Sequence, residues 1–451
     1  MAILVRMMRA GMDVARLNFA HGSYKEHAAL IKTIRLAAKK AGKTVAILQD
    51  LQGPKIRVGD LPAAGVTLHE GSTVTLSAAV KKYEPNGAIP VSYSRFHLDV
   101  MAGHRIFLDD GNLELEVLRV RGRIVHCHVK VGGLLLAHKG INLPDTKVTA
   151  PTFTDKDHQD LLFGVAQGVD WVCLSFVTGP EVLTRVRAII GQEAKKGGLR
   201  PPLVMAKIER AAALEQLDEI IDRANGIMIG RGDLGVEIPF EDVPVLQKDI
   251  IERCRLSSKP VIVATQMLES MRQNPRATRA EVSDVANAVF DHADAVMLSA
   301  ESATGRYPAT AVQAMASVIR EAEASRFDQL GEEMSGINCL ASSFAHALAV
   351  MAHRDLIQAV ATTSSLGPEV GFLNMYRMRI PILFAVPDAA AARQAILHAG
   401  FLPVVLDSQT ATFLPRLTAL TKKYLKLKHG QRVAVVLPGA RGAVSLSVVP
   451  V

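Results

Sequence analysis

Residues 203–230, LVMAKIERAAALEQLDEIIDRANGIMIG, contain the unit from which the fold can be predicted. Two short apolar runs, Leu203–Lys207 and Gly226–Gly230, flank a segment with helical spacing of apolar residues over Ala211–Ala224. Apolar strands joined by an amphipathic helix are typical of parallel βα units, because helices cover the faces of a parallel sheet. The same alternation extends along the chain in both directions.

Further strands of this series are expected at Val14–Phe19, Val45–Asp50, Trp171–Ser175, Val261–Thr265 and Ala295–Ser299. Between the second and third strands, polar and apolar residues alternate with regular glycines, which predicts a small all-β insertion. A second α/β segment is expected to contain strands near Ala359–Thr363, Ile382–Val386, Pro403–Leu406 and Val433–Leu437. We therefore expect a barrel over residues 1–54 and 146–330, a β-rich lid over 55–145 and a C-terminal α/β domain over 335–451.

Seven parallel βα units suggest the eight-stranded (β/α)₈ barrel, because a sheet of seven strands would leave two unpaired edges. The chain opens with a helical pattern over Leu4–Ala10, which Gly11 ends. In a barrel, a first strand would precede that helix. We expect this strand to be absent from the sequence, as it would be if the chain began one strand late.

Length and composition indicate a multidomain protein that binds a small anionic ligand. The 451 residues suffice for about three domains. The formal net charge of +8 is dispersed and only 5% of residues are aromatic, which favours a small anionic ligand over nucleic acid. No apolar run approaches the roughly 20 residues that span a bilayer. Cys127, Cys173, Cys254 and Cys339 form no CxxC pair, which argues against a zinc site or a disulfide framework and favours a reducing, cytoplasmic location.

Polar residues stand where the predicted strands end, the face of βα barrels that carries active sites. Glu209 and Asp233 are candidate ligands of a hard cation such as Mg²⁺, with two solvated loop acids as the alternative. Lys207 could neutralise a transferring phosphoryl group, and Arg16 could bind phosphate through two hydrogen bonds. The full set of strand-end residues is Arg16, Asn18, Asp50, Ser175, Lys207, Glu209, Arg231, Asp233, Thr265, Gln266, Ser299 and Glu301.

Residues 230–235, GRGDLG, fit the dinucleotide-binding pattern GxGxxG. The continuation Val236–Pro239 is a poor start for the helix that this pattern requires. We interpret the segment as a Gly-rich turn whose backbone N–H groups bind a carboxylate or phosphate.

Taken together, these residues resemble the pyruvate kinase family over nearly the whole chain. The stretches that carry the resemblance are ARLNFAHGSYKEH, DLQGPKIR, FLDDG, KGINLP, MAKIER, GIMIGRGDLGVEIP, ATQMLESM and TRAEVSDVANAVFDHADAVMLSAESATGRYP. The resemblance implies a (β/α)₈ barrel with an inserted lid and a C-terminal domain. It also implies transfer of the phosphoryl group of phosphoenolpyruvate to ADP, which gives pyruvate and ATP in glycolysis.

The resemblance also implies roles for single residues. Glu209 and Asp233 would hold Mg²⁺ or Mn²⁺, while Lys207 and Arg16 would contact the phosphoryl group. Gly232, Asp233 and Thr265 would hold the substrate carboxylate, and Thr265 and Ser299 would belong to a proton relay through water. Toward the nucleotide, the family pattern places Asn18, His21, Arg57 and Lys139.

The chain departs from the many family members that need K⁺. Asn18 and Asp50 remain, but Ala20 and Leu51 replace the usual Ser and Thr, and Lys55 stands where those members carry Glu. An ammonium group can supply the positive charge that K⁺ would otherwise provide. We therefore expect activity without K⁺; the alternative is that Lys55 merely faces solvent at the lid hinge.

The C-terminal segment Thr362, Thr363, Ser364 and Ser365 is a candidate effector site for a sugar phosphate or nucleotide, with an ordinary turn as the alternative. The family is usually a homotetramer, so we expect one here, with no nucleic-acid or membrane partner. Two other functions remain open: a weakly active or inactive truncated paralogue, and a Mg²⁺-dependent lyase or aldolase acting on pyruvate enolate.

Overall fold

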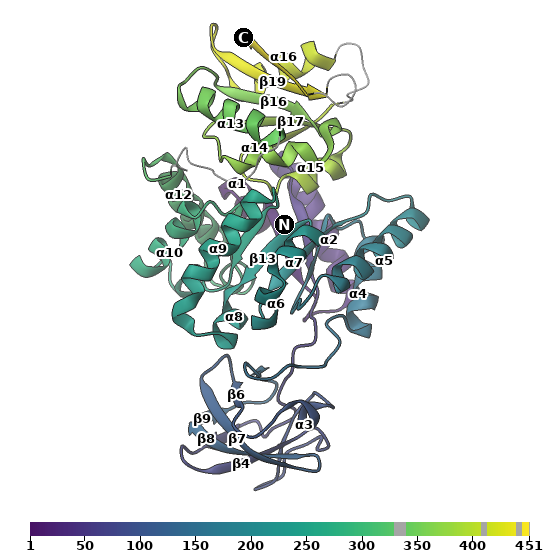
Figure 1. Cartoon of the computed structure of the whole chain (residues 1–451), viewed down its shortest axis with the longest axis vertical. Helices are drawn as coiled ribbons and strands as arrows, with labels where there is room; N and C mark the ends of the chain where they lie inside the picture. Colours follow the sequence, from purple (N-terminus) through teal and green to yellow (C-terminus); the bar gives the residue numbers. More distant parts are fainter. Residues whose placement is uncertain (329–339, 407–412, 439–443, 451) are drawn as a thin grey trace.

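The computed structural model describes residues 1–328, 340–406, 413–438 and 444–450. Figure 1 shows an elongated molecule with three parts along its long axis. The β-rich insertion lies at the bottom, the parallel sheet and its helices lie in the middle, and the C-terminal α/β part lies at the top. The insertion, formed by strands β3–β10, is called the lid below.

The central sheet carries the candidate site at the C-terminal ends of its strands. Within the described residues it is parallel and seven-stranded, in the order β1-β2-β11-β12-β13-β14-β15. The bounds of these strands are β1 Val14–Asn18, β2 Ala46–Asp50, β11 Trp171–Leu174, β12 Leu203–Ile208, β13 Gly226–Gly230, β14 Val261–Ala264 and β15 Ala295–Val296. The sheet curls, with β1 and β15 as its outer strands and no pairing between them among the described residues.

Helices cover the outer face of this sheet (Figure 1). Three of them begin with a capping box, in which Ser23, Thr154 or Thr278 and an acidic residue three positions later satisfy backbone N–H groups reciprocally. The bounds are α1 Ala2–Ala10, α2 Tyr24–Ala41, α4 Asp155–Ala166, α5 Glu181–Gly197, α6 Ala211–Glu215, α7 Leu217–Arg223, α8 Arg231–Glu237, α9 Val243–Leu256, α10 Arg279–Phe290, α11 Ala300–Ala303 and α12 Pro308–Ala324, with 3₁₀ turns η1 Phe240–Asp242 and η2 Glu269–Arg272. Helix α1 packs between α12 and α2.

The lid is a mainly antiparallel β structure with its own apolar core. Its elements are β3 Val66–Leu68, β4 Thr73–Ser77, β5 Ile89–Pro90, α3 Phe96–Asp99, β6 Arg105–Leu108, β7 Leu113–Arg121, β8 Ile124–Val131, β9 Gly133–Leu135 and β10 Ile141–Asn142. Alternate residues of β7, such as Leu113, Leu115 and Val117, are buried. This follows from the two-residue period of a strand with one face toward a core.

The C-terminal part contains a mixed sheet in the order β18-β17-β16-β19-β20, with only the β19–β20 pair antiparallel. Its described elements are α13 Leu340–His353, β16 Ala359–Thr363, η3 Ser364–Gly371, α14 Phe372–Met375, β17 Ile382–Val386, α15 Ala389–Ala395, β18 Phe401–Val405, α16 Phe413–Leu425, β19 Arg432–Pro438 and β20 Val444–Pro450. Leu397, which follows α15, is buried among Trp171 and Met205 inside the curled sheet. The C-terminal part therefore closes the N-terminal end of the barrel.

Three local predictions were wrong. The helix expected over Ala211–Ala224 is interrupted at Gln216, whose φ of −123° and ψ of 30° are not helical. The segment interpreted as a Gly-rich turn forms helix α8, because its apolar residue Leu234 is buried and β13 leads directly into the helix. The last barrel strand is shorter than Ala295–Ser299, because Glu301 accepts the Ser299 backbone N–H and turns the chain into α11.

Cys127, Cys173 and Cys254 are buried free thiols. Among the helices in the described ranges, none is both long enough and apolar enough to span a membrane.

Candidate active site

Asp50 ends β2 and joins residues from three neighbouring strand ends. Arg16 Nε lies 2.7 Å from Asp50 Oδ2, Ser175 Oγ donates to Asp50 Oδ1 at 3.2 Å, and Lys207 Nζ lies 3.9 Å from Oδ2. Burial raises the pKa of Asp50, but Lys207 and Arg16 outweigh it and keep the pKa below its ordinary value. Asp50 is therefore a buried anion that orients two cationic side chains.

Lys207, on β12, reaches the interior of this strand-end cluster, where its side chain is 12% exposed. Its Nζ contacts Glu209 Oε1 at 2.6 Å. Burial lowers the pKa of Lys207, but Asp50 and Glu209 more than offset this effect and raise it above its ordinary value. The lysine is thus a fixed positive charge, held by two carboxylates in a low-dielectric environment.

Glu209 and Asp233 form the acidic pair of the cluster. The pKa of Glu209 is raised to about 7, because burial and the nearby Asp233 carboxylate together outweigh the opposite effect of Lys207. Burial also raises the pKa of Asp233, but Lys55 outweighs it, and Asp233 accepts a hydrogen bond from Glu209. The two carboxylates are thus close enough for the charge of Asp233 to raise the pKa of Glu209.

This donor set fits a hard divalent cation. Mg²⁺ binds one or two protein carboxylates and completes its shell with substrate oxygens and water. No group of three or more His, Cys, Asp or Glu side chains in the described part of the chain is arranged to hold a metal. Glu209 and Asp233 could therefore hold a cation whose remaining ligands come from substrate and solvent.

Lys55 connects the hinge of the lid to this pair. Its Nζ lies 2.9 Å from Asp233 Oδ1, and both side chains are partly buried. Asn18 and Asp50 lie on the neighbouring strands β1 and β2 and are paired in register. Lys55 thus places a positive charge at the Asp233 carboxylate rather than in open solvent.

Gly232 and Thr265 meet at the ends of β13 and β14. A Cβ atom added to Gly232 would lie 2.7 Å from Thr265 Cγ2, so only glycine allows this approach. Thr265 has a φ of +78°, which is unfavourable for a β-branched residue. Arg231 stabilises this conformation because its Nη2 donates to the Thr265 carbonyl at 2.9 Å while its guanidinium pairs with Asp284.

Other predicted residues lie outside this group of contacts. Ser299 precedes α11, and its backbone N–H is bound by Glu301. Asn18 Oδ1 accepts the Ala20 backbone N–H, and the carbonyl of His21 contacts the ring of His27.

The two lid residues predicted to contact the nucleotide are also separate from the cluster. Arg57 donates to the His138 carbonyl, and Lys139 pairs with Asp109. Their distances to the barrel residues therefore depend on the position of the lid.

The predicted effector segment lies at the end of β16. Thr362 is buried, and its hydroxyl donates to the Val436 carbonyl at 2.9 Å, so this hydroxyl is already used within the sheet. Thr363 and Ser365 hydrogen-bond to each other through their hydroxyls at 3.1 Å.

Phe176 contacts the cluster through its backbone, and the sequence did not reveal this contact. Its backbone N–H donates to Glu209 Oε2 at 3.0 Å and fixes that carboxylate. A backbone donor leaves no signature in residue type. Only the position after Ser175, at a strand end, could have indicated it.

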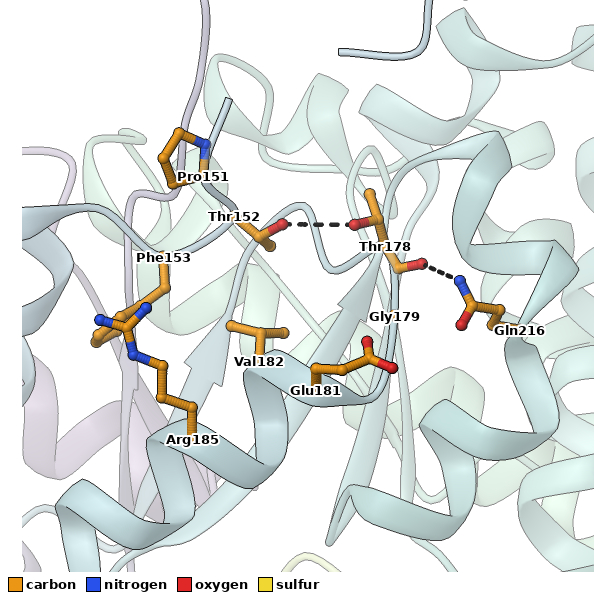
Figure 2. A pocket seen from close by; sticks show the side chains of 9 residues that line it. All are labelled: Pro151, Thr152, Phe153, Thr178, Gly179, Glu181, Val182, Arg185 and Gln216. Carbon is orange, nitrogen blue, oxygen red and sulfur yellow. Dashed lines mark hydrogen bonds between the residues drawn. The ribbon is translucent and has the colours of Figure 1, made fainter. Parts of the chain in front are cut away.

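A cavity of about 350 Å³ is lined by residues outside the cluster (Figure 2). It is bounded by Pro151, Thr152 and Phe153, which follow the lid, and by the β11–α5 connection. Figure 2 shows Thr152 facing Thr178 and the Gln216 amide bonded to the Thr178 carbonyl. The chemical cluster at the strand ends, rather than this cavity, is the candidate active site.

Comparisons with a family model, with known proteins and with a solved structure identify relatives of this chain. The family model for the barrel domain of pyruvate kinase matches residues 1–312. A pyruvate kinase of Staphylococcus saprophyticus is 41% identical over 418 residues, which cover 91% of this chain and 70% of that protein. One from Clostridium acetobutylicum is 37% identical over 413 residues, with 91% and 86% covered. The crystal structure of a pyruvate kinase from Cryptosporidium parvum matches with a TM-score of 0.90 and 31% identity, and the match covers 99% of this chain and 92% of that one.

Proposed function

Because this chain belongs to the pyruvate kinase family, we propose that the buried cluster around Lys207 and Asp50 is its site of phosphoryl transfer. Family membership confirms the resemblance found in the sequence and the α/β-barrel fold. The chain is therefore a phosphotransferase of glycolysis, a pyruvate kinase by its relatives. The observation that carries the assignment of the site is the contact of Lys207 with Glu209 and its approach to Asp50.

In the proposed reaction, the bond between phosphorus and the enolpyruvate oxygen of phosphoenolpyruvate breaks, and a bond forms to the terminal phosphate oxygen of ADP. Lys207 and Arg16 carry positive charge toward the phosphoryl oxygens, where they stabilise charge that develops in the transition state. Asp50 orients both cations. Enolpyruvate then takes a proton on carbon, supplied by water held near Thr265 and Ser299.

Glu209 and Asp233 would hold Mg²⁺ or Mn²⁺. The ion, when bound, neutralises charge on the phosphate oxygens. The narrow space between Gly232 and Thr265, with the N–H groups that begin α8, is suited to the substrate carboxylate. Asn18, His21, Arg57 and Lys139 would contact the nucleotide once the lid moves over the barrel.

Lys55 is proposed to make K⁺ unnecessary. Its ammonium supports Asp233 with a charge that K⁺ provides in other members, and Ala20 and Leu51 remove two oxygen ligands of the K⁺ site. Thr363 to Ser365 are proposed as an effector site, with Thr362 contributing no free hydroxyl.

The remaining proposals concern organisation. The catalytic barrel would comprise residues 1–54 and 146–330, the lid 55–145 and the regulatory domain 335–451. Within these bounds, residues 329–330, 335–339, 407–412, 439–443 and 451 lie outside the described residues. A cytoplasmic homotetramer is proposed because members of the family are usually homotetramers.

The experiment that tests this function is pyruvate formation from phosphoenolpyruvate and ADP with Mg²⁺ in a K⁺-free buffer. ADP-dependent turnover supports the reaction and the role of Lys55 together. Pyruvate release without ADP would favour a lyase. Thermal stabilisation by phosphoenolpyruvate and Mg²⁺ without turnover would favour a binding-only paralogue.

A further inference from the structure

Glu237 is a buried carboxylate next to the proposed metal site. It ends α8, one helical turn after Asp233, and its side chain is only 5% exposed. Burial raises the pKa of Glu237, whereas its neighbouring polar groups, the Asn142 side chain and the Ala211 backbone N–H, both lower it. Its Oε1 has no hydrogen-bond partner and lies 4.0 Å from Arg210 Nη1. An unsatisfied buried oxygen costs free energy, so the arrangement requires an explanation.

Arg210 connects Glu237 with Glu209. It follows Glu209 directly in the chain, and its guanidinium lies 5.2 Å from the centre of the Phe176 ring. Phe176 is the residue whose backbone N–H holds Glu209 Oε2. A shift of Arg210 would therefore move Glu209 in two ways: through the chain, because the two residues are adjacent, and through Phe176, whose backbone N–H binds Glu209.

Asn142 joins the lid to the same network. It lies on β10, which pairs with β6 of the lid and packs against α8 of the barrel. Asn142 is buried, and its Oδ1 also lacks a hydrogen-bond partner. The network therefore has an unsatisfied oxygen at its lid end and another at its barrel end.

We propose that Asn142, Glu237 and Arg210 are positioning residues that couple the position of the lid to the carboxylates of Glu209 and Asp233. The inference rests on the proposed function of those two acids. The 4.0 Å separation of Arg210 and Glu237 exceeds a charge-assisted hydrogen bond by about 1 Å. A small movement of β10 would carry Asn142 and Glu237, close the pair and give Oε1 its donor.

The space for such a movement is present. A cavity of about 410 Å³ separates the lid from the segment around Glu237, with Asp110 and Gly111 on one wall and Val236 and Phe240 on the other. The cavity therefore leaves room for the lid to shift relative to α8 beside the contact between β10 and α8.

A purely electrostatic role makes a different prediction. If the two charges act only through their fields, Glu237→Gln weakens divalent-cation binding whereas Arg210→Gln tightens it, because the removed charges have opposite signs. If Arg210 and Glu237 instead act by holding the carboxylates in place, both substitutions lower kcat. This positioning role also predicts that the double variant is no worse than either single variant, since each breaks the same pair.

The test compares the intact protein with Glu237→Gln, Arg210→Gln and the double variant. The readouts are kcat, Mn²⁺ binding to the protein alone, and hydrogen–deuterium exchange of segments 139–144 and 205–212. We expect kcat to fall about 10-fold in each single variant and equally in the double variant. Exchange should rise in both segments, Arg210→Lys should recover part of kcat, and Asn142→Ala should repeat the effect without removing a charge. Glu241→Gln, an exposed carboxylate on η1, is the control.

Multiplicative losses in the double variant, or opposite changes in Mn²⁺ affinity with unchanged exchange, would overturn the coupling. Absence of ADP-dependent turnover in the unsubstituted protein would instead overturn the proposed function. In that case, hydrogen–deuterium exchange alone tests whether the lid and the carboxylates are coupled. A rise in both segments supports the coupling, and a rise confined to one segment refutes it.

Discussion

Trp171 donates a hydrogen bond from Nε1 to the backbone carbonyl of Gln394 at 3.2 Å. This bond joins the first residue of barrel strand β11 to helix α15 of the C-terminal part. Trp171 is the sole tryptophan of the chain and is fully buried. Its fluorescence should therefore report whether the C-terminal part remains docked on the barrel.

Two buried aspartates strengthen the same interface. Asp170 accepts from Arg35 of the barrel and Arg393 of α15, so it is shared between the two parts. Asp294 lies 2.6 Å from Arg377 Nη2 and also accepts the Ala399 backbone N–H. Both aspartates stand just before a barrel strand, which explains why the C-terminal part meets the N-terminal face of the sheet.

The first prediction concerns Asp294→Asn. Loss of the carboxylate leaves Arg377 buried without its counter-charge, and breaking a buried pair in this way typically costs about 3–5 kcal/mol. We expect the free energy of unfolding to fall by that order in a denaturant titration followed by Trp171 fluorescence. Asp13→Asn, in an exposed pair with Lys43, is the control and should cost less than about 1 kcal/mol. Equal effects of the two substitutions would contradict the assignment.

The same variant makes a prediction about pH. Burial raises the pKa of Asp294, but Arg377 outweighs it and lowers the pKa below 3.8. A carboxyl with a depressed folded pKa stabilises the fold above its unfolded pKa and loses this effect as pH falls through the folded pKa. The difference in stability between the unsubstituted protein and Asp294→Asn should thus be full at neutral pH and shrink below about pH 4. A difference independent of pH would exclude an ionised Asp294.

Gly232→Ala should separate substrate binding from folding. Its methyl group would lie 2.7 Å from Thr265 Cγ2, so the strand ends must move apart. We expect the KM for phosphoenolpyruvate to rise at least 10-fold, equivalent to about 1.4 kcal/mol, with a smaller effect on the KM for ADP. Gly191→Ala is the matched control, because its Cβ has no neighbour within 4 Å and helix α5 should gain stability. An unchanged KM for phosphoenolpyruvate would remove Gly232 from the substrate site.

The regular elements of the barrel could be predicted because residues on buried faces are apolar, and they recur in the sequence at the spacing of a strand or a helix. Strand β13, Gly226–Gly230, has the predicted bounds, and strand β2, Ala46–Asp50, begins one residue after the predicted start at Val45. The break at Gln216 and helix α8 could not be predicted, because local spacing does not record which neighbouring helices and loops demand a bend. The left-handed conformation of Thr265 likewise depends on Arg231, which is distant in sequence.

The candidate site could be predicted where charged side chains stand at the C-terminal ends of predicted strands. Lys207, Glu209 and Asp233 converge because parallel strands end on one face. The contributions of Glu237 and Asn142 could not be predicted, since their function depends on the lid lying against α8. Barrel strands β11, β12 and β13 lie between these two residues in the sequence.

Lys207→Ala tests the proposed transition-state charge. Removal of one preorganised charge costs on the order of 10²–10³ in kcat, with little change in phosphoenolpyruvate affinity, because the charge acts mainly on the transferring group. Lys207 also lowers the pKa of Glu209, so its loss raises that pKa and weakens cation binding at neutral pH. Assays therefore use saturating Mn²⁺, with Lys207→Met to preserve the stem and exposed Lys196→Ala as control. Near-normal kcat in both Lys207 variants would exclude the assigned role.

Lys55→Glu tests whether the lysine replaces K⁺. The substitution puts a carboxylate where Nζ now lies 2.9 Å from Asp233 Oδ1, so two negative charges face each other. Like charges raise the pKa of Asp233 and weaken cation binding, unless a bound monovalent cation compensates. We expect turnover at saturating Mg²⁺ to fall at least 10-fold in a K⁺-free buffer and to recover as K⁺ is added. The unsubstituted protein and Lys81→Glu, an exposed lid variant, should respond little to K⁺. A Lys55→Glu variant with the same K⁺ response as the unsubstituted protein would mean that the lysine only tethers the lid hinge to Asp233.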